Sequence, residues 1–551
     1  MKLTKTTGTV FWFLMGVLFF IPFLGNVHLF DWDEINFAEI AREMIVQKNY
    51  MEPHINFVTF TEKPPLFFWL QALSMKCFGI NEYAARFPNA LLGSFVLPFL
   101  FRQGVNLKSI RFGMLWAMAY FGSILPALYF KSGIIDPVFN FFIFAGLLCL
   151  VKASWKKALF IPYRGQLLAA GTFAALAILT KGPAAILIIG LTMIAYFIAA
   201  KFKWFLSLVD VLIFSVVTLL VTAIWFVVNY LQTGEKFIIE FTIRQWQLLT
   251  TADAGHGGFL LYHFVVIFFG CFPAVAFMLF AFFKKEKNDK QLADLKKWMS
   301  ILFFVVLILF TLVNTKIVHY SSLCYYPLSF LAALSMDNFI AQQWRYKKWI
   351  TVVTLISSLP FIAAPFAVSY VTNNMDTLKS LLSKDPFAVE NMAAQINWSG
   401  LVMLPSILLL ITLAVFVFLI RKKSFTVGFA ALFIGSAIWL QLGLFFYIKN
   451  VEGISQRANI EFWQTKKHED CYFATYGYKS YTQLFYGAVK EHSNKNYTND
   501  EWLLHGNIDK PVYISCKTNS YKEFAANVND AKFLYSKNGF YFFERLRVSA
   551  R

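Results

Sequence analysis

The sequence predicts a polytopic α-helical membrane protein with about thirteen spans, followed by a small α/β domain. Three observations predict this fold class. The 551 residues are 58% hydrophobic and only 15% charged, whereas a soluble globular protein carries about a quarter charged residues. Apolar runs long enough to cross a bilayer recur along most of the chain. After about residue 450 these runs shorten to strand length and alternate with polar segments.

The thirteen apolar runs follow one another from residue 9 to residue 447. The first run begins like a signal sequence, but it is too long and lacks a small-residue cleavage site, so we expect an uncleaved span. The pattern is weakest in the two short runs that flank Lys181 and at the break near Asn314 and Lys316. The runs cover about 9–30, 84–104, 109–130, 135–152, 166–180, 183–200, 204–231, 258–283, 298–313, 320–338, 348–372, 399–420 and 425–447.

The charges between the runs orient the chain. With the N-terminus inside, thirteen spans place every basic cluster on the cytoplasmic side, as the positive-inside rule requires. The net charge of +19 is therefore explained by topology. No basic, aromatic-interleaved soluble module is visible in the sequence, so we expect no nucleic-acid partner. The clusters lie at about 102–111, 152–164, 201–203, 284–297, 345–348 and 421–423.

Two domains follow from this pattern. Residues 1–450 form a transmembrane domain whose first external loop, residues 31–83, is the hydrophilic interval after the first span. Residues 35–48 of that loop predict an amphipathic helix lying along the membrane surface, and Pro64-Pro65 suits a second helix start. Residues 451–551 predict a small extracytoplasmic α/β domain, in which Cys471 and Cys516 are either a disulfide pair or free thiols.

The first external loop also holds the strongest candidates for chemistry. Asp33 and Glu34 could serve as a base or a metal ligand, or they could only cap a helix. Glu62 and Lys63 could bind a metal and a phosphate, pair with each other, or be solvated loop residues. An ionisable group near a membrane centre costs roughly 2.5–3.5 kcal/mol, so charges that collect on one face require a reason.

More polar residues fall on the same external side. Asp136 begins the fourth run, where an Asp-Pro pair is also a common helix start. Lys181 lies in a Lys-Gly-Pro break and could hold a lipid phosphate or reach the interface. His256 is a candidate metal ligand on a glycine-rich loop. The segment from Asn314 to Tyr320, with Lys316, His319 and Tyr320, suits an anionic lipid head group.

Absent motifs narrow the function. The sequence contains no Walker-type loop, which disfavours ATP-driven transport. A secondary transporter should place charges near mid-span in two related halves, whereas the charges here gather at one face. An enzyme that acts on a lipid-linked substrate fits this distribution best.

Over about residues 30–90 the chain resembles the bacterial aminoarabinose-type lipid A glycosyltransferases, members of the GT-C group that includes the protein O-mannosyltransferases. The motifs that carry the resemblance are Asp33-Glu34, 37–44, Pro53-His54, 62–66, 69–73, Phe78-Gly79, Glu82, Ala85-Arg86, 180–183, and Thr315-Lys316 with His319-Tyr320.

The resemblance implies a GT-C fold and an inverting transferase in the bacterial inner membrane. Such an enzyme takes a sugar from polyprenyl phosphate and passes it to lipid A or another envelope acceptor at the periplasmic face. The alternatives are a protein O-glycosyltransferase of the same fold and, outside enzymes, a lipid or glycan transporter. The implied roles are catalysis for Asp33, Asp136 and Glu34, donor-phosphate binding for Lys63, Lys181, Tyr320 and Lys316, and a divalent metal (Zn²⁺, Mg²⁺ or Mn²⁺) at Glu62 and His256.

Overall fold

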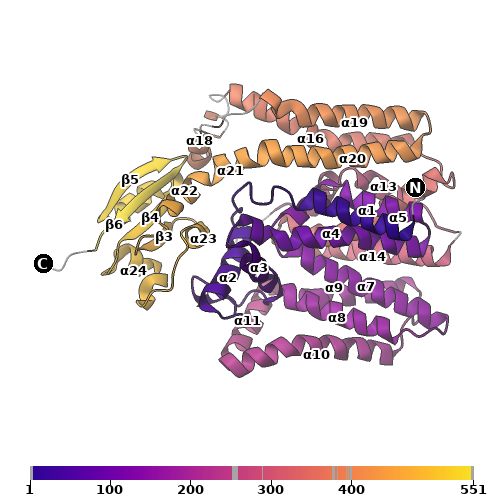
Figure 1. The fold of residues 1–551 in the computed structure, drawn as a ribbon, viewed down its shortest axis with the longest axis horizontal. Helices are drawn as coiled ribbons and strands as arrows, with labels where there is room; N and C mark the ends of the chain where they lie inside the picture. The colour runs from indigo at the N-terminus through magenta and orange to yellow at the C-terminus, as the bar shows by residue number, and fades with distance from the viewer. Residues whose placement is uncertain are drawn as a thin grey trace.

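The protein is a long helical bundle with a small sheet at one end, as Figure 1 shows. The computed structural model describes residues 4–250, 258–287, 289–374, 379–380, 382–392, 394, 396 and 400–547. Most bundle helices run along the long axis of the molecule, and the helices of the first loop lie between the bundle and the sheet. The predicted fold class, a polytopic helical protein with a small C-terminal sheet, is confirmed.

Each predicted apolar run overlaps a helix or a bent helix pair. Among the described residues, seven helices are long and apolar enough to cross a membrane, or nine spans if each bent pair counts as one. The count of thirteen stays a prediction. The bundle helices are α1 (Lys5–Phe20), α4 (Glu82–Leu107), α5 (Ile110–Phe121), α7 (Asp136–Ala158), α8 (Arg164–Lys181), α9 (Ala184–Ala199), α10 (Leu208–Thr233), α12 (Tyr262–Gly270), α13 (Ala274–Phe282), α14 (Lys290–Leu312), α15 (Tyr325–Ile340), α16 (Lys348–Asn373), α19 (Leu404–Arg421) and α20 (Phe425–Gly443).

Two of the runs are bent sharply inside the bundle. The first bends by 79° between α5 and the segment formed by α6 (Ile124–Leu128) and η1 (Tyr129–Lys131), and the second bends by 117° between α12 and α13. The bends contact each other, because the Ile124 amide donates to the Phe272 carbonyl at 3.1 Å. A bend exposes backbone groups that hydrocarbon cannot satisfy, and this contact satisfies two of them.

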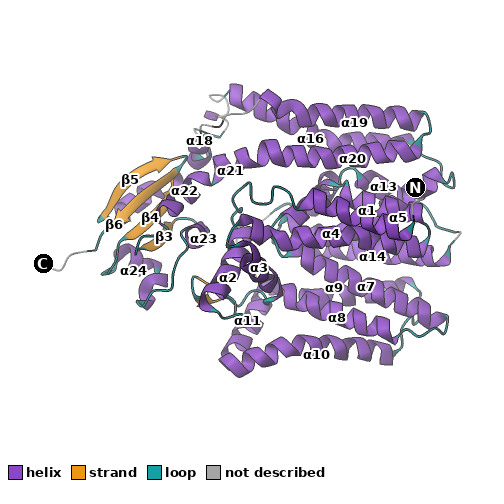
Figure 2. Ribbon diagram, viewed as in Figure 1, coloured by secondary structure: helices purple, strands orange, loops and turns teal. Residues whose placement is uncertain are grey.

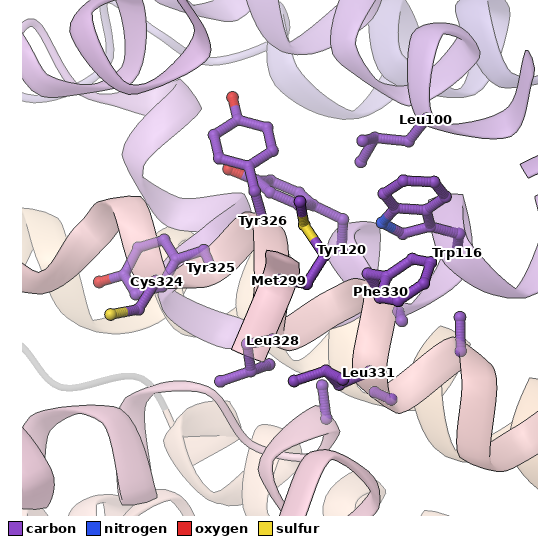
Figure 3. Packing of buried hydrophobic residues seen from close by; sticks show 14 of the residues in the cluster. Leu100, Trp116, Tyr120, Met299, Cys324, Tyr325, Tyr326, Leu328, Phe330 and Leu331 are labelled. Atoms are coloured by element: carbon purple, nitrogen blue, oxygen red, sulfur yellow. The ribbon is translucent and has the colours of Figure 1, made fainter. Parts of the chain in front are cut away.

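Helix α15 forms the centre of the core. Its residues from Tyr325 to Phe339 are all buried. Figure 3 shows Tyr326 and Phe330 packed beside Tyr120 and Trp116 of α5, and the Trp116 indole donates to Ser329 at 3.2 Å. The short helix η2 (Val318–Cys324) precedes α15 and brings the predicted Lys316–Tyr320 segment to the end of the bundle.

The first external loop folds into α2 (Asp33–Gln47), the hairpin β1 (His54–Ile55) and β2 (Val58–Thr59), and α3 (Leu66–Phe78). A helix therefore forms where residues 35–48 predicted one. Its charged face is not open to water, however. Arg42 pairs with Glu39 at 2.6 Å and donates to the Val489 carbonyl of the C-terminal segment at 2.9 Å. Long-range docking, which a local pattern does not encode, buries this face.

The Glu39–Arg42 pair shares its surroundings with another acid, Glu43. Burial, and the negative charge of Glu39, raise the pKa of Glu43 to about 9. Glu43 is therefore protonated at neutral pH, and the buried face of α2 holds one ion pair and one neutral acid.

The C-terminal segment carries a four-stranded mixed sheet in the order β3-β4-β6-β5 (Figure 2). Strands β3 and β4 are parallel, and the other two pairings are antiparallel. Cys471 and Cys516 are both free and buried; Cys516 pairs in register with Tyr476, well beyond Cys471. The elements are β3 (Tyr472–Tyr476), β4 (Val512–Lys517), β5 (Ala531–Lys537), β6 (Phe540–Arg545), α21 (Lys449–Ser455), α22 (Arg457–Lys466), α23 (Thr482–Tyr486), α24 (Asp500–His505) and α25 (Thr518–Asn527).

The remaining described elements connect the bundle to its surroundings. Helix α11 (Lys236–Thr250) follows α10 and lies beside the first loop (Figure 1). A π-helix, η4 (Leu444–Ile448), continues α20 into α21, so one rod of helix joins the bundle to the sheet. The shorter elements are α18 (Pro386–Asn391), η3 (Gly400–Met403) and η5 (Lys495–Thr498).

Candidate active site

Two carboxylates and one imidazole meet at the end of the bundle nearest the sheet. Asp33 begins α2, and Asp136 begins α7. His319 Nε2 lies 3.4 Å from Asp33 Oδ2 and 3.7 Å from Asp136 Oδ2. The Asp33 side chain is 36% exposed and that of Asp136 only 3%. Asp33 is therefore the carboxylate that a substrate can reach.

Burial lowers the pKa of His319, although Asp136 and Asp33 both oppose this effect. The imidazole is consequently neutral at neutral pH. A neutral ring offers one N–H group, which can be directed at only one of the two carboxylates at a time. His319 thus lies between the two carboxylates without neutralising them.

Lys181 supplies the positive charge beside Asp136. Its Nζ lies 2.6 Å from Asp136 Oδ1 and 5.3 Å from the centre of the Tyr320 ring. The next residue, Gly182, has φ = +96°, and a Cβ there would come within 2.9 Å of Gln245. Glycine is required because the chain must turn in a left-handed conformation between α8 and α9. This turn fixes Lys181 at the site.

Lys63 faces the same space from the loop before α3. Burial lowers its pKa, while Glu62, Asp33 and Asp136 favour its charged form. Among the residues that the structure describes, no carboxylate lies within ion-pair distance of Lys63. Its neighbour Glu62 instead pairs with Arg244 of α11. The site therefore holds two lysines, one of which is paired with an acid.

Glu34 has a different environment from its neighbour Asp33. It forms a buried ion pair with Arg86 of α4 at 2.7 Å, and it accepts hydrogen bonds from the amides of Phe30 and Gly133. Burial alone would raise the pKa of Glu34, but Arg86 and the two amides bring it below its ordinary value. These contacts hold α2 against the bundle, so Glu34 is a positioning residue in this geometry.

Lys316 also makes contacts other than those expected of a donor ligand. Its Nζ donates to the carbonyls of Thr311 at 2.7 Å, Val313 at 2.5 Å and Phe310 at 3.2 Å. These carbonyls close the C-terminus of α14, where orphan acceptors and the helix dipole favour a cation. The geometry assigns Lys316 to the end of α14.

The predicted metal site is not tested. His256 lies outside the described residues, and the Glu62 carboxylate already has a guanidinium partner. Within the described ranges, no three His, Cys, Asp or Glu side chains are grouped as metal ligands. A metal at Glu62 and His256 therefore stays a prediction.

The C-terminal segment covers one edge of the site. Lys479 Nζ lies 5.0 Å from the centre of the Trp32 ring, next to Asp33 in the chain. Tyr481 packs on Trp32 with ring centres 6.0 Å apart, and its amide donates to Asp31 Oδ1 at 3.4 Å. An exposed cation and two aromatic rings thus border the space in front of Asp33.

Sequence reasoning missed the partners of three of these groups. His319 stands in the Lys316–Tyr320 motif, but nothing local indicated that it would lie between two distant aspartates. Arg244 is one charge on an amphipathic helix. Lys479 lies about 450 residues from Trp32, and no sequence pattern connects the two. An alignment of related chains is the signal that could have linked them.

The fold and sequence have recognisable relatives. Residues 10–243 match the family model of dolichyl-phosphate-mannose-protein mannosyltransferase. The undecaprenyl phosphate-alpha-4-amino-4-deoxy-L-arabinose arabinosyl transferase 1 of Proteus mirabilis is 25% identical over 335 residues, covering 59% of this chain and 58% of that protein. The corresponding transferase of Shewanella sediminis is 27% identical over 329 residues, covering 58% and 57%. The chain thus spans under three fifths of the length of these relatives.

Solved structures extend the likeness to the whole chain. The crystal structure of ArnT from Cupriavidus metallidurans bound to undecaprenyl phosphate superposes with a TM-score of 0.75, at 16% identity, over 100% of both chains. Its apo form gives the same TM-score over 98% of this chain. The expected GT-C fold and the expected resemblance to the aminoarabinose-type transferases are both confirmed, and the protein is a multi-pass membrane protein.

Proposed function

We propose, from this kinship in sequence and fold, that the chain is an inverting glycosyltransferase that takes a sugar from polyprenyl phosphate. The acceptor is lipid A or a related envelope glycan, and transfer takes place at the periplasmic face of the bacterial inner membrane. The observation that carries the proposal is the meeting of Asp33, Asp136, His319 and Lys181 at one end of the bundle.

The charges suit the departure of a lipid phosphate. In transfer, the bond between the sugar C1 and the phosphate oxygen breaks, and its electron pair stays on the phosphate. The new bond to the acceptor oxygen forms on the opposite face of C1. Fixed cations stabilise negative charge that increases on the leaving group, and Lys63 and Lys181 are such cations. The ring of Tyr320 borders Lys181 and lies beside the same head group.

Asp33 acts on the acceptor. It accepts the proton of an acceptor hydroxyl or, if the acceptor is already anionic, orients its attacking oxygen. Asp136 is buried and bound to Lys181, so it positions that lysine and His319 and does not contact the acceptor. Glu34 holds α2 in place through Arg86.

Transfer of a labelled sugar is the direct test. Purified protein is mixed with labelled polyprenyl-phosphate sugar and extracted lipid A, and the label in lipid A is counted. Incorporation supports the proposal. Donor binding without incorporation would mean that the acceptor is a protein or another glycan. No donor binding contradicts the transferase and favours a transporter.

A protein acceptor is the second candidate function. The family model that matches residues 10–243 describes protein mannosyltransferases, so the N-terminal half of the chain is compatible with that reaction. Adding a cell-envelope protein extract to the same assay, followed by gel separation of labelled products, distinguishes the two acceptors.

Removal of the Lys181 charge is expected to weaken donor binding. Lys181→Gln loses a charge-assisted hydrogen bond to phosphate, which contributes about 1.5–3 kcal/mol, so the Kd for undecaprenyl phosphate should rise roughly 10- to 150-fold. Lys181→Arg keeps the charge and should recover part of the affinity. A Kd that is unchanged in Lys181→Gln would remove Lys181 from the donor site.

Removal of the Lys316 charge should affect stability instead. Lys316→Met leaves three carbonyls at the end of α14 without their donor, which should cost about 1–3 kcal/mol. The expected result is a lower melting temperature with an unchanged Kd for undecaprenyl phosphate. If the Kd instead rises as it does for Lys181→Gln, Lys316 binds the donor phosphate, as the sequence predicted.

A further inference from the structure

A cavity opens at the end of the bundle opposite Asp33. It has a volume of about 260 Å³ and lies between the C-terminal ends of α4 and α7 and the N-terminal turns of α14. Lys152 is sixteen residues beyond Asp136 on the same helix, which separates them by roughly 24 Å at a rise of 1.5 Å per residue. The cavity is therefore distinct from the site of transfer.

The inner part of this cavity is apolar. Trp116, Leu148, Val151 and Leu295 line it, and each is at most 4% exposed. The volume is just below the range of about 300–1,000 Å³ of small-molecule pockets. The apolar lining and this volume suit one end of an acyl chain.

The rim of the cavity is positively charged. Lys152 and Lys156 line it, and Lys152 Nζ donates to Gln103 Oε1 at 2.5 Å. Within the part of the chain that the structure describes, neither lysine has an acidic partner within 4 Å. Two other lysines at this end of the bundle do have acidic partners, because Lys108 pairs with Asp337 and Lys157 pairs with Asp210.

An acid bonded to Trp155 of this rim does not pair with the two lysines. Asp294 of α14 accepts hydrogen bonds from the Trp155 indole at 2.7 Å and from the Tyr196 hydroxyl. Two neutral donors thus hold the carboxylate. The rim keeps a net positive charge that a phosphate could satisfy.

The loop after α7 places the rim at the level of the membrane surface. Leu159, Phe160 and Ile161 are 58%, 97% and 46% exposed, and Leu159 and Ile161 also line the cavity. Consecutive exposed apolar side chains beside lysines are typical of segments at the boundary between head groups and acyl chains. The opening of the cavity therefore faces lipid.

We propose that this cavity binds an anionic membrane lipid in the leaflet opposite the site of transfer. The lipid phosphate lies between Lys152 and Lys156, and the first part of one acyl chain enters the apolar space beside Trp116 and Leu148. Basic pockets between helices on the cytoplasmic side are known to recognise anionic head groups. The bound lipid joins α4, α7 and α14. The opposite ends of α4 and α7 carry Arg86 and Asp136.

The test compares lipids by thermal unfolding of the full-length protein in an uncharged detergent. A ligand of the folded state raises the melting temperature, and phosphatidylglycerol should raise it by about 3 °C or more over phosphatidylcholine. The variant Lys152→Gln with Lys156→Gln should lose that difference. Lys201→Gln with Lys203→Gln removes equal charge from an exposed loop expected on the same face and should keep it.

The outcomes decide the proposal. An unchanged phosphatidylglycerol effect in the Lys152→Gln, Lys156→Gln variant overturns it, as does an equal effect of phosphatidylcholine on wild type. An equal shift with glycerol 1-phosphate would mean that the rim binds a soluble phosphate and that no acyl chain enters. Native mass spectrometry of lipid adducts provides a second readout on the folded fraction, and Val151→Phe, which fills the cavity but keeps both charges, should also reduce adduct formation.

Discussion

The variant Asp33→Asn is expected to lose sugar transfer while it keeps its fold and its donor affinity. The carboxylate that receives or orients the acceptor is replaced by an amide of the same shape that cannot accept a proton. Loss of a general base lowers turnover by about 10²- to 10⁴-fold. The fold should tolerate the change, because Asp33 is 36% exposed and its neighbour His319 is neutral, so no ion pair is lost.

The measurement is kcat with a labelled donor, together with the Kd for undecaprenyl phosphate. Asp31→Asn is the matched control, since the same chemical change is made two residues earlier. Asp31 faces the C-terminal segment, where Ser480 and the Tyr481 amide contact it. Its loss should change kcat much less. If Asp33→Asn retained wild-type turnover, the proposed base would be wrong and Asp136 would be the next carboxylate to test.

The place of the candidate site could be predicted from sequence because polar residues between apolar runs must lie at membrane edges. Asp33, Asp136 and Lys181 flank such runs, Lys63 lies in the loop between two of them, and positive-inside counting assigned all four to one face. The structure brings them together at one end of the bundle. Local pattern was sufficient here because membrane thickness confines the ends of every span to one of two planes.

The partner of each charge could not be predicted in the same way. Glu34 and Asp33 are adjacent in sequence, yet one pairs with Arg86 and the other faces open space. Lys316 and Lys181 both end an apolar run, but only Lys181 contacts a carboxylate of the site. These differences come from the packing of helices distant in sequence. The same packing turned the charged face of α2 toward Val489 and not toward water.

The second large effect concerns the buried pair of Glu34 and Arg86. Arg86→Met should destabilise the protein by about 3–5 kcal/mol, because an unpaired carboxylate then remains in a buried site. The arginine also donates to the carbonyls of Leu24, Val27 and His28. Glu34→Gln with Arg86→Met should recover part of this loss, since no charge is then left without a partner. Chemical denaturation of all four proteins in one detergent measures the coupling energy.

The contribution of the Glu34–Arg86 pair to stability should depend on pH with a definite sign. The pKa of Glu34 is lowered in the folded state, so its stabilising contribution is complete above its ordinary value of 4.5 and is lost as pH falls through the folded value. In Arg86→Met the buried acid takes up a proton more readily, so the stability difference from wild type should shrink toward acidic pH.

A coupling energy near zero at neutral pH would instead mean that contacts of the C-terminal segment with α2, such as that of Arg42 with Val489, position Asp33. In that case, variants of Arg42 and not of Arg86 would control turnover.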